Sequence, residues 1–142
     1  MMPSMITSLH VATGAAGGVL VGSRARALAL GMLLHAAGDR VPHQDIPSRR
    51  FETFSGTGAA LAVAAARGPL SPALVGAVAA SAPDLEHVVR LPRPGGRKLF
   101  PSHRFRGWHR AGGVSAPAQL LAAGFLLGLV VGGPRRAIPG RG

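Results

Sequence analysis

The chain contains five apolar stretches of helical length, each bounded by glycine, proline, serine or arginine. They cover residues 7–22, 25–38, 53–66, 72–87 and 115–131. Regular alternation of apolar and polar residues is absent, and β-branched residues are few beside the alanines and leucines, which favours helices over strands. Only two residues separate the first two stretches, and Arg67-Gly68-Pro69 separates the third from the fourth, so each pair is predicted to form a helical hairpin. We therefore predict a single all-α domain over residues 1–142, a small bundle of about five helices with a basic loop at 88–112.

The composition favours a membrane protein, because 47% of the residues are hydrophobic and only 15% are charged. A membrane span needs about 20 apolar residues. Only the fifth stretch, inside an uncharged run from Ala111 to Pro134, approaches that length. The shorter stretches would have to tilt, cross as a packed bundle or lie in the interface. The helices are therefore predicted to be membrane-embedded or membrane-associated, with membrane lipid as a partner.

Two rows of glycines recur at every fourth position, which places each row along one face of its helix. Gly14, Gly18 and Gly22 form the first row, and Gly124, Gly128 and Gly132 form the second. Small residues let helix backbones approach closely in lipid, whereas each glycine would cost about 1 kcal/mol relative to alanine in a water-soluble helix. Both rows are therefore predicted to be packing faces, within the bundle or toward a second copy of the chain in a homo-oligomer.

The net charge of +11 comes from fifteen arginines and one lysine against only five acidic residues. The basic residues are scattered through every connection, and aromatic residues make up only 4% of the chain, so no nucleic acid is expected as a partner. A basic module that binds a membrane surface or a nucleic acid ranks third among the interpretations of this sequence. The first charged residue is Arg24 and His10 interrupts the preceding apolar run, so we expect no secretory signal and a retained amino terminus.

Histidines and acidic residues are rare here, but the predicted topology gathers them. The chain has six histidines and no cysteine, so a metal site must use imidazole and carboxylate groups. If consecutive helices run up and down, the start of the first, the ends of the second and fourth, and the start of the fifth lie at one end of the bundle. That end then holds His10, His35, Asp39, His43, Asp84, Glu86, His87, His103 and His109.

Spacing along the helices supports a shared site. His35 and Asp39 are four residues apart, and Asp84 and His87 are three apart, so each pair lies on one helix face. Taken alone, His10 could be an interfacial histidine and Asp84 a turn residue. Together the groups suit one or two divalent ions, with zinc expected first and manganese or iron as alternatives, because two ions can clamp the attacking and leaving oxygens of a phosphoester. The expected ligands are His10, His35, Asp39, His43, Asp84, His87, His103 and His109.

Two segments carry a family resemblance. "PDLEH" at 83–87 and "HRFRGWH" at 103–109 resemble the Pro-Asp-x-Asp-His and His-Arg-Gly-x-x-His elements of the membrane-bound metal-dependent hydrolases, a family that includes a LexA-regulated inner-membrane protein. His10 in "SLHVATGAAGG" is similar to that family's opening. "LLHAAGDRVPHQD" is similar to the His-x-x-x-Asp-x-x-Pro-His pattern of small bacterial membrane proteins of related type. The likeness covers roughly residues 5–110.

The resemblance implies a metal-dependent hydrolase of the bacterial inner membrane that acts on a phosphoester or a lipid-like molecule. Glu86 and Asp45 are the expected general bases. Two departures from the pattern, Glu86 in place of Asp and Arg110 in place of Ser, favour the alternative of a non-catalytic metal-binding or metal-sensing membrane protein. The spacing from His103 to His109 is also one residue longer than in the pattern. Basic residues are more numerous in the connections at the site end, so the positive-inside rule predicts a site that faces the cytoplasm.

Overall fold

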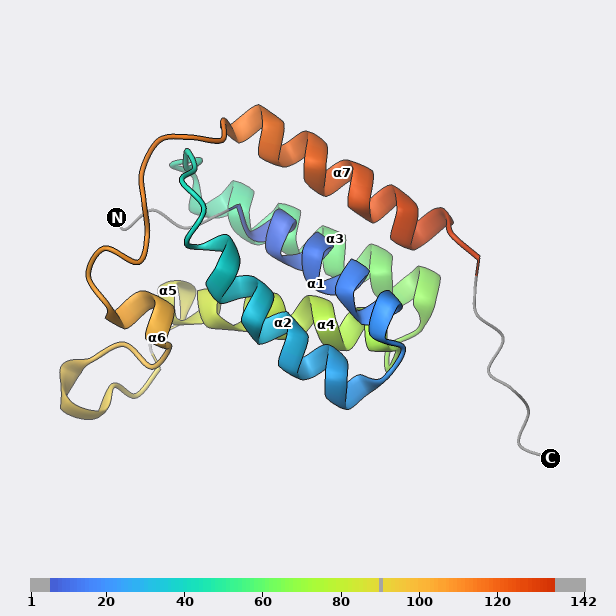
Figure 1. Cartoon of the computed structure of the whole chain (residues 1–142), viewed down its shortest axis with the longest axis horizontal. Helices are drawn as coiled ribbons and strands as arrows, with labels where there is room; N and C mark the ends of the chain where they lie inside the picture. The colour runs from blue at the N-terminus through green and yellow to red at the C-terminus, as the bar shows by residue number, and fades with distance from the viewer. Residues whose placement is uncertain (1–5, 90, 135–142) are drawn as a thin grey trace.

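A computed structural model describes residues 6–89 and 91–134 as a bundle of helices with one long irregular connection (Figure 1). The long helices are α1 (Thr7–Val21), α2 (Arg24–Gly38), α3 (Arg49–Arg67), α4 (Pro72–Ser81) and α7 (Ala116–Gly132). Short helical turns lie between α4 and α7: η1 (Ala82–Asp84), α5 (Leu85–Val88), η2 (Pro94–Gly96) and α6 (Pro101–Arg104). None of the described residues lies in a β-strand, so the all-α prediction is confirmed for them.

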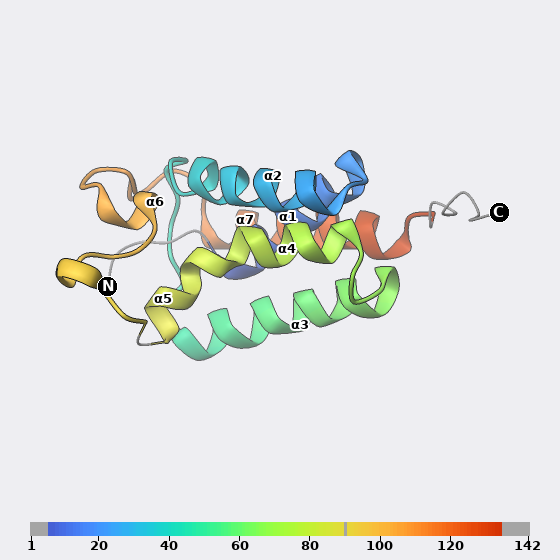
Figure 2. The same ribbon diagram turned by 90° about the horizontal axis from the view of Figure 1, so that it is seen from below.

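Helix α1 occupies the centre of the bundle and contacts α2, α3, α4 and α7. The long helices alternate in direction along the chain, as predicted (Figure 1). Seen from below, α2, α4 and α3 lie one beneath another, with α1 and α7 behind them (Figure 2). The main buried cluster consists of small or β-branched side chains, namely Val11, Ala15, Ala59, Val63, Ala73, Ala77 and Val130. Small side chains bring the helix axes close together and leave the larger apolar residues to the periphery.

The third helix begins earlier than predicted. The Oγ atom of Ser48 accepts the N–H of Phe51 at 3.2 Å and caps the first turn, so α3 begins at Arg49 and not at residue 53. The capping serine determines the start of the helix, although the first two helical residues are arginines.

The stretch 72–87, predicted as one helix, is divided into α4, η1 and α5. The division falls at Pro83, which has no N–H to donate to the preceding turn. The predicted loop at 88–112 also contains helical turns, η2 and α6. The break at Pro83 redirects the chain, so that the polar residues that follow α4 lie at the end of the bundle.

Two members of the first glycine row, Gly14 and Gly18, form a close helix contact, as predicted, whereas Gly22 is the left-handed residue that ends α1. A Cβ atom on Gly14 would overlap the carbonyl group of Gly76, and a Cβ atom on Gly18 would overlap that of Pro72. A Cβ atom on Gly31 would lie 2.6 Å from the carbonyl oxygen of Gly76. Helices α1, α2 and α4 therefore meet at backbone distance, and we call Gly14, Gly18, Gly31 and Gly76 the glycine seam.

The second glycine row does not pack within the described part of the chain. Around Gly124, Gly128 and Gly132 an added Cβ atom would meet nothing within 4 Å. Helix α7 turns a different face inward, with Gln119, Ala123 and Val130 buried. The predicted role of this row in packing the bundle is therefore wrong, and contact with a second copy of the chain stays a prediction.

In the described part of the chain, no helix combines the length and the apolarity that crossing a membrane requires. Helix α7 has 17 residues, which rise about 26 Å, less than the ~30 Å of a hydrocarbon core. Helix α3 has 19 residues, but it begins with Arg49 and Arg50 and includes Glu52. The predicted transmembrane helices are thus not found among the described residues.

Candidate metal centre

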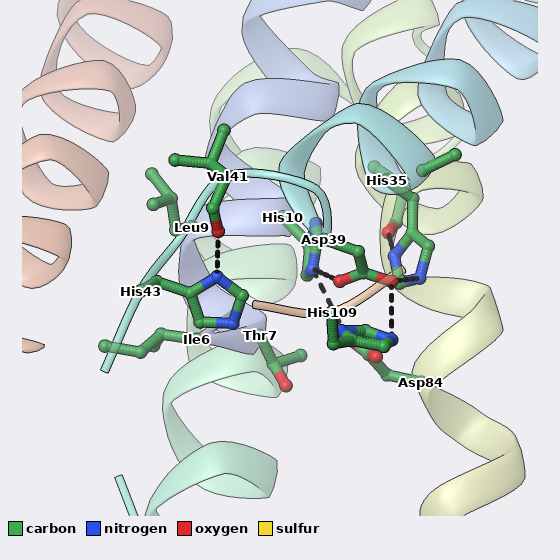
Figure 3. Close-up of polar contacts among 12 residues, drawn as sticks. Ile6, Thr7, Leu9, His10, His35, Asp39, Val41, His43, Asp84 and His109 are labelled. Atoms are coloured by element: carbon green, nitrogen blue, oxygen red, sulfur yellow. Dashed lines mark hydrogen bonds and ion pairs between the residues drawn. The ribbon is translucent and has the colours of Figure 1, made fainter. Parts of the chain in front are cut away.

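One end of the bundle brings together polar side chains from six segments, and Figure 3 shows five of these side chains, those of His10, His35, Asp39, Asp84 and His109. The residues are His10 from α1, His35 at the end of α2 with Asp39 directly after it, Asp84 from η1, Glu86 and His87 from α5, His103 from α6, and His109 beyond it. Most of them are buried, although buried histidines and carboxylates are rare in small proteins. The gathering predicted from an up-and-down topology is therefore confirmed.

Asp39 lies at the middle of this group and is completely buried. Its Oδ1 atom is 3.3 Å from Nε2 of His10, and its Oδ2 atom is 3.0 Å from Nε2 of His35. Nε2 of His103 and Nε2 of His109 each lie 3.5 Å from the same Oδ2 atom. Four imidazole rings from four segments thus surround one carboxylate.

Asp84 is the second carboxylate of the group. Its Oδ2 atom lies 4.0 Å from Nε2 of His10, and its Oδ1 atom lies 3.8 Å from Nε2 of His103. Both carboxylate oxygens are buried and have no hydrogen-bond partner. Burial is the main influence on this carboxyl group and raises its pKa. A positive ion beside Asp84 would favour its ionised form.

Hydrogen bonds at Nδ1, the ring nitrogen that does not face Asp39, fix the orientations of His35 and His103. Nδ1 of His35 lies 2.8 Å from the carbonyl oxygen of Ala80, and Nδ1 of His103 lies 2.5 Å from Oε1 of Glu86. Both acceptors require an N–H at Nδ1, which leaves a lone pair on each Nε2 atom of a neutral ring. These two Nε2 atoms face each other at 3.3 Å. Two facing lone pairs at this distance repel unless a proton or a metal ion lies with them.

Glu86 is buried and uses both carboxylate oxygens. Oε1 accepts the Nδ1–H of His103, and Oε2 accepts the N–H of Leu99 at 2.8 Å. Burial alone would raise the pKa of Glu86, but the N–H of Leu99 and the ring of His103 outweigh burial and lower it. A carboxylate that orients a ligating imidazole is a recurrent partner in metal sites. The observed bonds favour this positioning role over the general-base role, which stays a prediction.

The spacing of the donors fits a metal ion. Zinc ligands at about 2.0–2.1 Å from the ion, arranged as a tetrahedron, lie about 3.3 Å from one another. The distances around Asp39 span 3.0 to 3.5 Å. Three overlapping sets place all their ligand atoms within 4.8 Å of one another: His10 with His35 and Asp84, His35 with Asp39 and His103, and Asp84 with His87 and His103. Because the sets share members, they suit one ion or two neighbouring ions.

Buried polar atoms without hydrogen-bond partners also support a metal site. Both oxygens of Asp39, both ring nitrogens of His10 and Nε2 of His87 are buried without a hydrogen bond of normal geometry. Such atoms are costly in a protein interior unless a charged group satisfies them. The buried His/Asp group can hold a metal ion, and the identity of the ion does not follow from the geometry.

Burial and the neighbouring charged groups shift the pKa values of His35 and His87 in opposite directions. Burial would lower the pKa of His35, but its close contact with the Asp39 carboxylate and the charge of Asp84 raise it. Burial opposes ionisation of Asp39 too, and the rings of His10 and His103 reverse this and hold its pKa far below the usual range. Burial lowers the pKa of His87 to about 4, with help from His103. A neutral His87 at pH 7 is in the form that binds metal.

His43 and Asp45 lie apart from the three donor sets. Nδ1 of His43 bonds to the carbonyl oxygen of Val41 at 2.5 Å, and its Nε2 atom is 3.6 Å from Oδ1 of Asp45. In Figure 3 the ring of His43 lies beside Ile6, away from the group around Asp39. The ligand role of His43 and the general-base role of Asp45 stay predictions.

Two polar residues that hold the site together are not apparent as such in the sequence. Gln119 is buried, donates to the carbonyl oxygen of Gln44 at 2.7 Å and accepts the N–H of Ile6 at 3.3 Å. Trp108 Nε1 donates to the carbonyl oxygen of Ala36 at 2.9 Å and so fixes the segment that carries His109. Gln119 is the only polar side chain within the apolar part of α7, and Trp108 is the single tryptophan of the chain and lies in a basic segment. Only this contrast with their neighbours could have indicated a structural role in the sequence.

Comparisons with protein-family models, with curated proteins and with solved structures find no match to this chain. The resemblance to the membrane-bound metal-dependent hydrolases therefore rests on the motifs themselves, which contain His10, His35, Asp84, His103 and His109.

Proposed function

We propose that this chain is a membrane-bound metal-dependent hydrolase that acts on a phosphoester or a lipid-like substrate. The observation that carries the proposal is the meeting of the Nε2 atoms of His35 and His103 beside Asp39, with both Nδ1 atoms already bonded. A divalent ion would satisfy these lone pairs and the carboxylate together. Zinc is the first candidate, and manganese and iron also accept this mixture of imidazole and carboxylate.

When bound, the ion would act as a Lewis acid and lower the pKa of a water molecule to near neutrality. The residues of the chain would hold and orient the donors. The carbonyl oxygen of Ala80 fixes the ring of His35, and Glu86 fixes that of His103. Hydrolysis would then add one water across the ester bond, so that the acid product takes the hydroxyl and the alcohol takes the proton.

The distribution of apolar side chains supports the membrane part of the proposal. The core is built from alanine, valine and glycine, whereas many large apolar side chains face outward. Those more than half exposed include Leu20, Leu28, Leu33, Phe54, Leu61, Leu121 and Phe125. Proteins in water rarely leave large contiguous apolar surfaces exposed, and contact with lipid would cover them. The inner membrane of a bacterium, with the centre toward the cytoplasm, is the proposed location.

Cell fractionation tests this location. We expect the protein in the membrane fraction, with release only by detergent. Recovery in the soluble fraction without detergent would contradict the membrane part of the proposal and leave the metal part standing.

Elemental analysis of the detergent-purified protein tests the metal centre. Wild-type protein should carry about one or two equivalents of zinc, manganese or iron. His35→Ala and Asp84→Ala should both lose the metal, because each removes a donor from two of the three sets. Unchanged metal content in Asp84→Ala would remove that residue from the ligands. Absence of metal from wild type, even after reconstitution with each ion, would end the hydrolase interpretation.

A non-catalytic metal-binding or metal-sensing membrane protein is the second candidate. It is favoured by burial, because His10 and Asp39 are completely buried, and structural metal sites are closed whereas catalytic sites keep a position open. Stoichiometric metal with no turnover of any phosphoester or carboxylic ester would decide for this candidate.

A further inference from the structure

A cleft of about 660 Å³ opens directly beside the candidate metal centre, within the usual volume range of small-molecule sites. Its lining comes from one short stretch of sequence, namely Arg97, Lys98, His103, Arg104, Phe105 and Arg106. Four of these residues are cationic, and none of the described residues that line the cleft is acidic. His103 belongs both to this lining and to the donors around Asp39.

The negative charge of Glu86 acts on Lys98, but no described carboxylate forms an ion pair with the three arginines of the cleft. All ion pairs between described residues join a histidine to an acidic residue, and none involves Arg97, Arg104 or Arg106. Both oxygens of Glu86 accept hydrogen bonds, from His103 and from the N–H of Leu99. Arg97, Arg104 and Arg106 are exposed and line one cleft, so an anion held among them would gain attractive contacts with several guanidinium groups at once.

We propose that this cleft binds the phosphate group of the substrate, with the guanidinium groups of Arg97, Arg104 and Arg106 as its partners. Arginine presents a planar fork of N–H donors that matches two phosphate oxygens, and such charge-assisted bonds are among the strongest in proteins. Phe105 offers an apolar wall for the organic group that carries the phosphate. The inference rests on the proposed function and narrows it, because a neutral ester would leave the arginine charges unpaired.

The second cleft at this end has a different character. It measures about 520 Å³ and is lined by Arg49, Glu86, His87, Val88, Val89, Leu91 and Arg93. It contains two arginines beside one carboxylate, with His87 and three apolar side chains, so its charge is closer to balance. Arg49 therefore offers a matched control, an arginine beside the same centre but outside the proposed phosphate site.

Titration calorimetry of inorganic phosphate into the full-length protein tests the proposal, with zinc-loaded and zinc-free samples side by side. We expect binding in both samples. The double variant Arg104→Gln/Arg106→Gln should weaken binding roughly tenfold or more in both, because it removes two charge-assisted partners. Arg49→Gln should leave the affinity unchanged. The fluorescence of Trp108, the single tryptophan and a close neighbour of Phe105, gives a second readout of binding.

Failure of this inference is distinguishable from failure of the proposed function. Phosphate binding that needs zinc and is unaffected by the double variant would overturn the cleft and leave the metal centre intact. Arginine-dependent phosphate binding by a protein that never takes up metal would support the cleft and overturn the hydrolase. Absence of phosphate binding in every sample, together with absence of the vesicle binding described next, would overturn the cleft.

Vesicles identify the source of the phosphate group. Protein that binds vesicles containing phosphatidic acid, but neither pure phosphatidylcholine vesicles nor inorganic phosphate, would assign the cleft to a lipid headgroup if Arg104→Gln/Arg106→Gln abolishes the binding. Binding of inorganic phosphate alone would assign it to a soluble phosphoester. Vesicle binding that the double variant leaves unchanged would count against the cleft.

Discussion

Glu86 illustrates how the role of a single residue depends on its neighbours. In the sequence it is one acidic residue of "PDLEH", equally suited to solvent, to metal or to proton transfer. In the structure it is buried, and its two oxygens accept from the ring of His103 and the backbone of Leu99. It therefore joins a backbone turn to the ring of His103, a candidate ligand, and its negative charge would make that ring a better electron donor to an ion.

Replacing Glu86 by glutamine tests this positioning role. Glu86→Gln keeps the size of the side chain and an oxygen acceptor for His103 but removes the charge. We expect the affinity for zinc to fall roughly 10–100-fold, measured by competition with a chelating dye. Asp45→Asn makes the same change at an exposed carboxylate and should leave the affinity unchanged. Equal losses in the two variants would indicate a general effect of charge.

The lowered pKa of His87 predicts how the stability of the metal-free protein changes at acidic pH. Burial lowers its folded pKa to about 4, whereas the unfolded chain takes up the proton near 6.5. The stability that depends on neutral His87 is therefore complete above pH 6.5 and is lost as the pH falls toward 4. Metal-free His87→Gln should lose less free energy of unfolding than the metal-free wild type between these two values. Urea unfolding at each pH measures it, and equally steep losses would contradict the lowered pKa.

The sequence predicts the candidate metal ligands better than it predicts the groups that hydrogen-bond to those ligands. His35 with Asp39 and Asp84 with His87 follow from helical spacing, because residues three or four apart share a face. The acceptor behind His35 is the backbone carbonyl of Ala80, on another helix. Its position depends on how closely α2 and α4 approach, which spacing within one helix does not determine.

At the scale of the elements, the glycine seam predicts a sharp contrast between two substitutions. Gly76→Ala would press a methyl group into the backbone of Gly14, with the Cα atom of Gly18 also only 3.3 Å away. We expect it to reduce the free energy of unfolding by about 1–3 kcal/mol. Gly128→Ala faces open space in α7 and should be neutral or add up to about 1 kcal/mol.

Thermal unfolding of both variants in detergent measures the contrast. Similar stability of the two variants would mean that α1 and α4 separate easily and that the seam is not a tight contact. Weaker zinc binding by Gly76→Ala would follow as well, because Asp84 lies just beyond α4 and His10 lies on α1.

The sequence predicts where the helices lie better than it predicts which face of each helix packs against the others. Serine caps and proline stops predicted most boundaries, but the break at Pro83 lay inside an apolar run and was missed. The two glycine rows look alike in the sequence, yet only the first lies in the bundle. For α7, the buried face is marked instead by Gln119, Ala123 and Val130. Which face of a helix turns inward is a property of the assembled bundle.

At the scale of the whole molecule, metal should couple the end of the bundle to global stability. An ion that binds only the folded chain stabilises it by about 2.7 kcal/mol when the free ion is at one hundred times its dissociation constant. Removal of metal with a chelator should therefore lower the Tm of wild-type protein. His35→Ala should show no such difference, because it has lost the site. If a chelator removes the metal and the Tm of wild-type protein does not change, metal binding is not coupled to the stability of the bundle.

The arrangement of the first four long helices was largely predictable, because the short connections from α1 to α2 and from α3 to α4 force each pair to run antiparallel. Alternating directions then place His10, His35 and Asp84 at one end, whereas His103 and His109 lie in the long connection before α7. The depth of burial was not predictable, since it depends on the segment between α5 and α7 folding back over the helix ends. The basic composition of that segment suggested an exposed loop, but it places His103 in the interior.

The glycine seam also has a consequence for the rate at which an ion would come and go. No side-chain layer separates α1 from α4 at the seam, so the position of His10 on α1 is tied to the packing of α4. His103 and His109 belong instead to the connection, which a few bonds such as Trp108 to Ala36 hold in place. Breaking those bonds would open the centre while the helices stay packed. The residence time of an ion would then be set by this local opening, independently of the rate at which the bundle unfolds.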